Sequence, residues 1–412
     1  MSSELQFEPS SLSEEIIESE TNELSKRRTM TGRHLAEKVF LDGFIPMKTP
    51  ESQFANLGRM MDSLIIDQSP AIQAITSALD RAGVRLQNDN RPKATFGFLG
   101  PTGVGKSETA KILSELLEDG EGKLLRIDCT DFTHGHEVSK LTGAPPGFAG
   151  HKQKPILSKA NVEGKNTIIL FDEIEKAASE LHNIVLPIIG DGELSLNNGE
   201  LVNFRDTIVI FTSNLGASEM NSLMRGRTIG FASPERETNK KIIEKTAINA
   251  FEKNFKPEFT NRINQLVVFQ HLSETGLRGV LNVKLNVVND QYEDEYGVRI
   301  SLSDATVEHI IEIAKKQPEL GARPLVRAFE DNILTTFGRY AGAKALRSGT
   351  HIRVFHRSEL LDYDNKDDLE LVFTSARDRS IKKKPGKVLV FPPMIADNKD
   401  EPVVKKPMGE LC

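Results

Sequence analysis

The stretch GPTGVGKS at residues 100–107 decides the fold of this chain, and its residues are Gly100, Pro101, Thr102, Gly103, Val104, Gly105, Lys106 and Ser107. It matches the phosphate-binding loop G-x-x-x-x-G-K-[ST] at every fixed position. The apolar run 94–99 predicts a buried strand before it, and the apolar spacing over 108–117 predicts a helix after it. In such a unit, backbone N–H groups and the positive end of the helix face a bound phosphate. The sequence therefore predicts a site for a nucleoside triphosphate.

Residues within this loop have the chemistry that such a site needs. The glycines let the backbone turn tightly and approach the anion. The Lys106 ammonium can reach the outer phosphates, and the Ser107 hydroxyl can ligate magnesium.

The composition of the whole chain argues against several classes of protein. Its 412 residues leave room for two or three domains, and 38% of them are hydrophobic. A net charge of −6 gives no support to a nucleic-acid-binding body. The absence of tryptophan argues against base-stacking platforms, although 21 phenylalanines leave them open. The two cysteines, Cys129 and Cys412, predict neither a disulfide framework nor a metal cluster. No apolar run reaches membrane-spanning length and the N-terminal segment is acidic, so we expect a cytoplasmic protein with no membrane partner.

Five apolar runs predict the strands of a parallel α/β sheet: 94–99, 123–127, 167–171, 207–211 and 265–269. Helical patterns separate them, including one over 54–86, so helices should cover both faces of the sheet. After about residue 272 the pattern changes. Amphipathic helices are expected over 277–292, 305–314 and 324–337, and short strands at 351–355 and 369–373. These elements predict a smaller α+β domain.

We divide the chain into a flexible polar arm (1–44), a nucleotide-binding domain (45–271), a smaller C-terminal domain (272–375) and a disordered tail (376–412). The arm is either a solvated segment or a docking segment for a partner, and its composition leaves both open.

Polar residues follow the predicted strands, at the edge of the sheet where ligands gather. Asp172 suits a magnesium ligand, Glu173 suits the orientation or deprotonation of the attacking water, and Asn214 can position that water or the terminal phosphate. An Asp-Glu pair can also be a simple helix cap. Phosphoryl transfer needs further positive charge, for which Arg262 and Arg323 are candidates, although either could form an ordinary surface ion pair.

Taken together, these motifs resemble the AAA+ superfamily, and within it the second ATPase module of the two-ring Clp unfoldases. The stretches that carry the resemblance are 100–107, 126–128, 141–147, 170–177, 204–205, 212–216, 257–262 and 320–325. They cover roughly residues 45–375, so the chain looks like a single-ring member without the first ATPase module. The resemblance implies an AAA+ P-loop fold with a C-terminal lid domain, ATP and Mg²⁺ as cofactors, and a homohexameric ring.

The resemblance also implies a role for individual residues. Asp172 and Glu173 become the Walker B pair, and Asn214 becomes the first sensor. Arg262 becomes a finger donated to the neighbouring subunit, and Arg323 becomes the second sensor. The adenine would be flanked by Ile65 and Ile66. The axial pore loop that grips polypeptide would consist of Gly147, Phe148, Ala149 and Gly150.

The chain also departs from the family pattern. Phe148 replaces the usual tyrosine, and Asp67 replaces a glycine common after the adenine-flanking pair, which leaves the base contacts open. Residues 151–155 are locally basic, and Glu193 and Glu200 replace arginine in the second pore loop. The electrostatics of the pore should therefore differ from those of relatives.

The tripeptide Ile229, Gly230 and Phe231 divides the functional options. In protease-associated relatives a similar tripeptide docks into a peptidase ring, but three such residues can also occur by chance or pack internally.

The leading hypothesis is an ATP-dependent unfoldase that threads unfolded or tagged proteins through its pore, with or without a Clp-type peptidase. The alternatives are a peptidase-independent disaggregase or remodeller, a nucleic-acid-acting AAA+ ATPase and an inactive scaffold. The acidic charge disfavours the nucleic-acid reading, and the complete set of site residues disfavours the scaffold.

Overall fold

The computed structural model describes residues 56–83, 90–117, 122–144, 154–164, 166–225, 236–335, 337–338, 350–356, 371–377 and 388–390. The predicted arm (1–44), pore loop (147–150) and docking tripeptide (229–231) lie outside these ranges, as does most of the predicted tail. Within the described ranges, no helix combines the length and the apolar character that crossing a bilayer requires.

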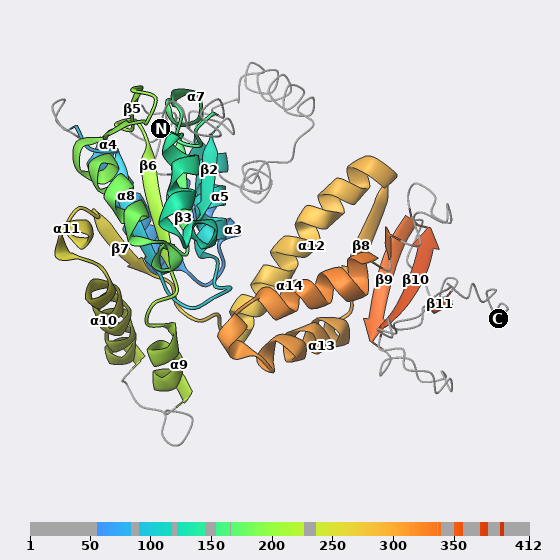
Figure 1. Ribbon diagram of the computed structural model, residues 1–412. Helices are drawn as coiled ribbons and strands as arrows, with labels where there is room; N and C mark the ends of the chain where they lie inside the picture. Colours follow the sequence, from blue (N-terminus) through green and yellow to red (C-terminus); the bar gives the residue numbers. More distant parts are fainter. Residues whose placement is uncertain are drawn as a thin grey trace, which may run out of the picture.

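The larger part of the molecule is built on a five-stranded sheet with the order β2-β3-β6-β1-β7 (Figure 1). All its neighbouring strands run parallel. The strands are β1 (Ala94–Leu99), β2 (Leu124–Asp128), β3 (Ile168–Asp172), β6 (Ile208–Ser213) and β7 (Gln265–Val268). Each lies within two residues of the predicted run at both ends. The parallel α/β fold expected from the sequence is therefore confirmed.

Successive apolar residues of a strand alternate between two hydrophobic cores, which explains why helices cover both faces of the sheet. In β3, Ile168 and Leu170 belong to one hydrophobic core, whereas Ile169 and Phe171 belong to another on the opposite face. Successive side chains of a strand point to opposite faces, so an apolar run of this kind needs helices on both.

Two groups of helices supply these covers. Next to the first core lie α3 (Leu57–Leu64), α4 (Ser69–Gly83) and α5 (Lys106–Leu116). The second core receives α8 (Ser179–Asp191), α9 (Ala217–Arg225), α10 (Arg236–Asn254) and α11 (Pro257–Thr260). The single helical pattern predicted over 54–86 is two helices, because the chain bends at residues 65–68 between α3 and α4.

Short elements connect the strands of this part. They are η3 (Cys129–Phe132), η4 (Gly135–Val138), α6 (Ser139–Thr142), α7 (Lys159–Val162), η5 (Ile174–Lys176) and the hairpin of β4 (Glu193–Ser195) and β5 (Leu201–Asn203).

The smaller part combines helices with a four-stranded sheet of order β11-β10-β9-β8. Its elements are α12 (Glu274–Tyr296), β8 (Val298–Leu302), α13 (Asp304–Lys315), η6 (Pro318–Leu320), α14 (Arg323–Phe329), the π-helical turn η7 (Glu330–Leu334), β9 (Thr350–His356), β10 (Leu371–Arg377) and β11 (Val388–Val390). Strand β8 was not predicted. Strand β11 lies in the segment assigned to the tail, and it pairs with β10 through the apolar residues 388–390. The proposed domain division at residues 271–272 falls between β7 and α12.

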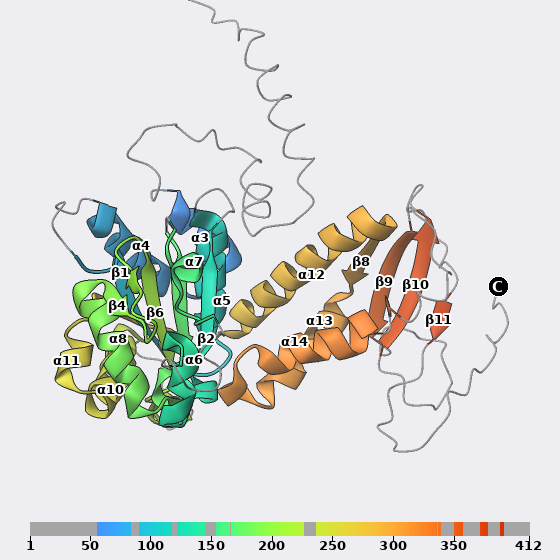
Figure 2. The ribbon, with the colours of Figure 1, turned by 45° about the horizontal axis from the view of Figure 1, so that its top comes forward.

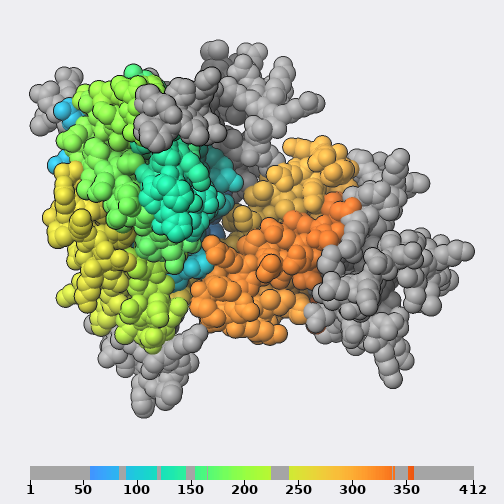
Figure 3. All heavy atoms as spheres, in the orientation of Figure 1, coloured from blue at the N-terminus to red at the C-terminus, as the bar shows by residue number. Residues whose placement is uncertain are grey.

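The two parts meet along a seam at the start of the long helix α12, which then runs away from the larger part toward β8 and β9 (Figure 2). The surface is hollowed where the gold surface of α12 faces the cyan and green residues of the larger part (Figure 3). This hollow coincides with a pocket that residues of both parts line.

Candidate nucleotide site

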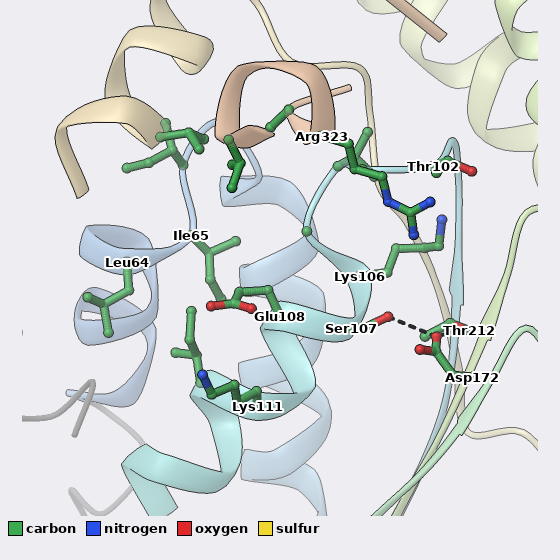
Figure 4. Close-up of a pocket in the computed structure, with 18 of the residues that line it drawn as sticks. Leu64, Ile65, Thr102, Lys106, Ser107, Glu108, Lys111, Asp172, Thr212 and Arg323 are labelled. Atoms are coloured by element: carbon green, nitrogen blue, oxygen red, sulfur yellow. Dashed lines mark hydrogen bonds between the residues drawn. The ribbon is translucent and has the colours of Figure 1, made fainter. Parts of the chain in front are cut away.

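The pocket at the seam encloses about 770 Å³. The phosphate-binding loop contributes residues 102–107, and the carboxyl ends of β3 and β6 contribute Asp172 and Thr212. Helix α12 lines the opposite wall with Val280, Val283 and Val287. Figure 4 shows polar side chains of the loop and strands at one end and the apolar Leu64 and Ile65 at the other. The pocket thus has a polar half at the loop and strand ends and a mainly apolar half, where Glu108 and Lys111 lie beside Ile65 and Leu64 (Figure 4). This division suits a phosphorylated nucleoside.

The phosphate-binding loop has the open backbone that an anion site requires. Gly103 and Gly105 adopt positive φ angles of 73° and 103°, which favour glycine. A Cβ atom added to Gly105 would enter open space, so the backbone there is bare toward the pocket. Helix α5 begins directly after it at Lys106, and its first N–H groups add positive potential. The loop residues therefore fit a phosphate group.

Lys106 is the cationic side chain of the loop, and it is buried, with 7% of its surface exposed. Its Nζ donates hydrogen bonds to the carbonyl oxygens of Gly100 and Pro101, both at 2.6 Å, and to Asn214 Oδ1 at 2.9 Å. Burial lowers the pKa of Lys106 to about 8, although the nearby carboxylates, first Glu175 and then Asp172, act in the opposite direction. Gly100 and Pro101 do not line the pocket; they fix the ammonium at its edge.

Asp172 is the centre of a polar cluster at the end of β3. Its Oδ1 accepts hydrogen bonds from Ser107 Oγ at 2.8 Å and Thr212 Oγ1 at 2.5 Å. Its Oδ2 accepts from Arg126 Nη2 at 2.6 Å. A hydroxyl and a carboxylate oxygen are ligands that Mg²⁺ uses together with waters and substrate phosphates. Because no group of three or more His, Cys, Asp or Glu side chains in the described ranges could bind a metal, a cation here would depend on those further ligands.

Glu173 and Asn214 lie side by side next to this cluster. Glu173 has a left-handed backbone (φ 56°), and its N–H donates to Thr212 Oγ1 at 2.9 Å. Its carboxylate oxygen Oε1 accepts a hydrogen bond from Asn214 Nδ2 at 3.2 Å. The Asn214 backbone N–H donates in turn to Glu175 Oε1 at 3.0 Å. The Asn214 amide thus contacts both the Glu173 carboxylate and the Lys106 ammonium.

Arg323 reaches the pocket from the smaller part. It is the first residue of α14, and its side chain extends toward Lys106 (Figure 4). The preceding residue, Ala322, donates its backbone N–H to Gly103 O at 2.9 Å. The start of α14 is therefore attached directly to the phosphate-binding loop, which places a second cation over the polar half of the pocket.

Ile65 and Ile66 occupy the bend between α3 and α4 and line the apolar half. Ile65 is buried. A Cβ atom at Gly279 of α12 would lie 2.6 Å from Ile66 Cγ2, so α12 approaches Ile66 closely. Asp67, at the position where glycine was expected, adopts the left-handed φ of 64° that a glycine would adopt readily.

Arg262 does not line this pocket. Its Nη1 donates to the carbonyl oxygen of Leu186 at 2.8 Å, and its Nη2 forms an ion pair with Glu258 at 3.1 Å. The guanidinium also lies against Gly190 of α8, where a Cβ atom would be 2.4 Å from Nη1. The structure therefore brings the nucleotide-contact candidates of its described residues together in one pocket, with three exceptions: Gly100, Pro101 and Arg262 do not line it.

Sequence reasoning gave no role to three residues that shape the site: Arg126, Thr212 and Glu175. Arg126 and Thr212 bind Asp172 directly, and Glu175 binds the Asn214 backbone. Thr212 was identifiable in principle, since it ends the strand next to Asp172. The role of Arg126 depends on the pairing of β2 with β3, which places Asp128 opposite Asp172.

The fold and the pocket define a P-loop nucleotide-binding protein of the AAA type, and comparison with known proteins supports this class. Residues 91–266 match the family model described as "AAA domain (Cdc48 subfamily)". Residues 272–354 match "C-terminal, D2-small domain, of ClpB protein". The first match ends within β7 and the second begins just before α12, so the boundary between them falls close to the division at residues 271–272.

Among curated relatives, the chaperone protein ClpB of Bacteroides thetaiotaomicron is 36% identical over 293 residues, which cover 71% of this chain and 33% of ClpB. The Clp protease ATP-binding subunit ClpC of Staphylococcus saprophyticus is 33% identical over 317 residues, which cover 77% of this chain and 38% of ClpC. The chain thus spans about a third of the length of these relatives. It belongs to the Clp family of AAA+ ATPases.

Solved structures of Hsp104 have the same architecture. A closed-state reconstruction with ATPγS and FITC-casein aligns with a TM-score of 0.61 and 26% identity, covering 74% of this chain and 51% of that one. An extended conformation of the Saccharomyces cerevisiae Hsp104:casein complex aligns with a TM-score of 0.64 and 26% identity, covering 79% of this chain and 54% of that one.

Proposed function

We propose that this chain is an ATP-dependent protein unfoldase that acts as a ring and hydrolyses ATP in the pocket at the seam. The observation that carries the proposal is the Asn214 side chain, which contacts both Lys106 and Glu173. It joins the group that would bind the terminal phosphate to the group that would activate water. A site built only to store nucleotide would not need this connection.

Each step of hydrolysis has a residue suited to it. Lys106 and the loop N–H groups would bind the β and γ phosphates, and Ser107 and Asp172 would hold Mg²⁺. Bound Mg²⁺ would neutralise the charge that develops on the phosphates. Glu173 would accept a proton from the attacking water, and Asn214 would orient both. Arg323 would sense the terminal phosphate from the smaller part, since α14 is attached to Gly103.

The position of Arg262 supports a site completed by a neighbouring subunit. In the described chain this guanidinium lies outside its own pocket, bound to the Leu186 carbonyl and to Glu258. An arginine supplied in trans typically contributes about 10³ to 10⁵ in rate. Head-to-tail contacts that place Arg262 at the next subunit's pocket would generate a closed ring, and we propose that this ring is a homohexamer. In it, Asn214 and Arg323 would act as the two sensors and Arg262 as the arginine finger.

Polypeptide would pass through the centre of this ring, gripped by Phe148 on the loop 147–150. Support comes from the base of that loop. Asn197, at the tip of the β4–β5 hairpin, donates from Nδ2 to Gly143 O at 2.5 Å and to Thr142 Oγ1 at 3.0 Å. The segment leading into the first pore loop and the hairpin of the second are thus joined. The Hsp104 structures named above, which contain casein, give the analogy for the substrate class.

We further propose a cytoplasmic protein with unfolded or tagged proteins as substrates and no membrane or nucleic-acid partner. Whether a peptidase receives the unfolded chain depends on the tripeptide 229–231. The curated relatives include both a chaperone, ClpB, and a protease subunit, ClpC. Substitution of Ile229 and Phe231 by serine should abolish peptidase-dependent degradation and leave ATP hydrolysis intact if the loop docks, and should change neither in a disaggregase or remodeller.

The test of the proposal is unfolding of a fluorescent protein that carries an unstructured tail. The full chain with ATP and Mg²⁺ should extinguish the fluorescence. The chain with ADP, or the Lys106→Ala variant with ATP, should not. A wild-type chain that neither binds nor hydrolyses ATP would overturn the proposal, and tight, salt-sensitive binding of DNA or RNA would favour the nucleic-acid alternative.

A further inference from the structure

Asp67 joins the nucleotide pocket to the smaller part of the molecule. It follows the pocket-lining pair Ile65 and Ile66, and its carboxylate oxygen Oδ2 accepts a hydrogen bond from the backbone N–H of Ser273 at 2.7 Å. Its backbone lies in the left-handed region at φ 64°, where aspartate is tolerated better than most residues but still costs energy relative to glycine. A strained residue whose side chain forms a long-range hydrogen bond suggests a function for that side chain.

The bond partner Ser273 begins the helix that forms one wall of the pocket. Ser273 is the N-cap of the 23-residue α12, and its Oγ accepts from Gly276 N at 3.0 Å. The Asp67 carboxylate therefore lies at the positive end of this helix, where an anion is favoured. A Cβ atom at Gly276 would lie 2.6 Å from Asp67 Oδ2, so the Asp67 carboxylate is also packed closely against the first turn of α12. One turn further, Val280 already lines the pocket.

The next residue fastens the same junction. Gln68 is 1% exposed, and its Nε2 donates to Gln270 O at 2.8 Å while its Oε1 accepts from Gln270 N at 3.1 Å. Its Nε2 also lies 3.4 Å from the carbonyl oxygen of Val104 in the phosphate-binding loop. Gln68 is thus part of the folded core of the junction, whereas Asp67 is exposed and forms a bond that can be removed without opening a cavity.

We propose that Asp67 is a positioning residue that fixes the start of α12 against the adenine-flanking pair and thereby sets the affinity of the pocket for nucleotide. The inference rests on the proposed ATPase function. When the bond to Ser273 is present, the wall formed by Val280, Val283 and Val287 stands at a fixed distance from Ile65 and Ile66. When it is absent, the wall must be ordered by the nucleotide itself, and binding weakens accordingly.

Two substitutions separate the effect of the Asp67–Ser273 hydrogen bond from the effect of the left-handed backbone at residue 67. Asp67→Gly removes the bond but relieves the left-handed strain, so it should leave the melting temperature within about 2 °C of wild type. Asp67→Asn retains an oxygen that can accept from Ser273 N and tolerates the same φ. The control is Asn166→Gly: Asn166 also has a positive φ, 52°, and its Oδ1 accepts a bond from Lys93 Nζ at 2.7 Å, but it does not line the pocket.

The experiment uses the full chain and a fluorescent ATP analogue that is not hydrolysed, followed by steady-state ATP hydrolysis. Asp67→Gly should raise Kd and KM by about 3- to 10-fold, the effect of one exposed hydrogen bond, with kcat within about 2-fold. Asp67→Asn should bind within about 2-fold of wild type, and Asn166→Gly should match wild type. Unchanged affinity in Asp67→Gly, or equal weakening in Asn166→Gly or in Asp67→Asn, would overturn the inference. Failure of the wild-type chain to bind the analogue would instead contradict the proposed function.

Discussion

Asn214 Nδ2 lies 3.2 Å from Glu173 Oε1, so the amide donates a hydrogen bond to the carboxylate that follows β3. The opposite end of the same amide accepts from Lys106 at 2.9 Å. A single planar group therefore connects the ends of two strands with the phosphate-binding loop. Any shift of Lys106 toward a bound phosphate must alter the bond on which the orientation of Glu173 depends.

Replacement of Glu173 tests its assignment as the base. Glu173→Gln keeps the shape and can still interact with Asn214, but it cannot accept a proton from water. We expect ATP hydrolysis to fall by at least about 100-fold, with ATP affinity within a few-fold of wild type. Pre-steady-state hydrolysis and equilibrium binding measure the two quantities. Glu180→Gln, on the exposed start of α8, is the matched control, and rapid turnover by Glu173→Gln would refute the assignment.

A change at Asn214 tests the connecting amide. Asn214→Asp keeps an acceptor for Lys106 but places a second carboxylate oxygen next to Glu173 Oε1. Repulsion between like charges at about 3 Å should displace Glu173, and we expect kcat to fall by about 10-fold or more while KM changes little. Equal kcat values for this variant and the wild type would show that the orientation of Glu173 does not depend on Asn214.

The pH dependence of nucleotide binding should report on Lys106. Burial lowers its pKa from the ordinary 10.5 to about 8, so the ammonium loses its proton as the pH rises through 8. Since only the charged form attracts phosphate, ATP affinity should be full at pH 7 and should weaken progressively up to pH 9. Titration calorimetry across this range, with Lys106→Met as the pH-insensitive control, measures the effect. A flat profile in the wild type would contradict it.

The pore assignment predicts a separation of ATP hydrolysis from unfolding. Phe148→Ala removes the aromatic ring that would grip the polypeptide, and Phe148 is not among the residues assigned to nucleotide binding. ATP hydrolysis should stay within about 2-fold of wild type, and unfolding of a stable fluorescent substrate should be lost. Phe148→Tyr, which retains a ring, should remain active. Normal unfolding by Phe148→Ala would exclude this loop from the pore.

Much of the larger part was predictable because its strands are buried on both faces and therefore apolar throughout. Strand β1 begins and ends at the predicted residues, and β3 and β6 start one residue later than expected. The candidates Asp172, Glu173 and Asn214 followed from these strands, since the carboxyl ends of parallel strands share one edge. Residues 100–107 followed from their motif, and Ile65 and Ile66 from the family resemblance alone.

The remaining features depend on contacts between distant segments, which a local pattern does not encode. The apolar periodicity over 54–86 continues across the bend at Asp67 and so does not reveal it. The bend is stabilised by hydrogen bonds to Ser273 and Gln270, some 200 positions away. Strand β8 is different, because its alternation of buried Val298 and Ile300 with Arg299 and Ser301 is a local strand signal that the prediction overlooked. Its pairing with β9, far along the chain, is what no local pattern encodes. The hydrogen bond from Arg262 to the carbonyl oxygen of Leu186 depends likewise on the packing of α8.

The central claim, that each ATP site is completed by a neighbouring subunit, is tested most directly by mixing two inactive variants. Lys106→Ala loses the phosphate contact of its own pocket, and Arg262→Ala loses the arginine offered to the next one. Each alone should hydrolyse ATP at least about 100-fold more slowly than wild type. In mixed rings, pockets with an intact Lys106 beside an intact Arg262 should recover a measurable fraction of wild-type turnover. Mixtures no more active than either variant alone, or an Arg262→Ala chain as active as wild type, would contradict the account.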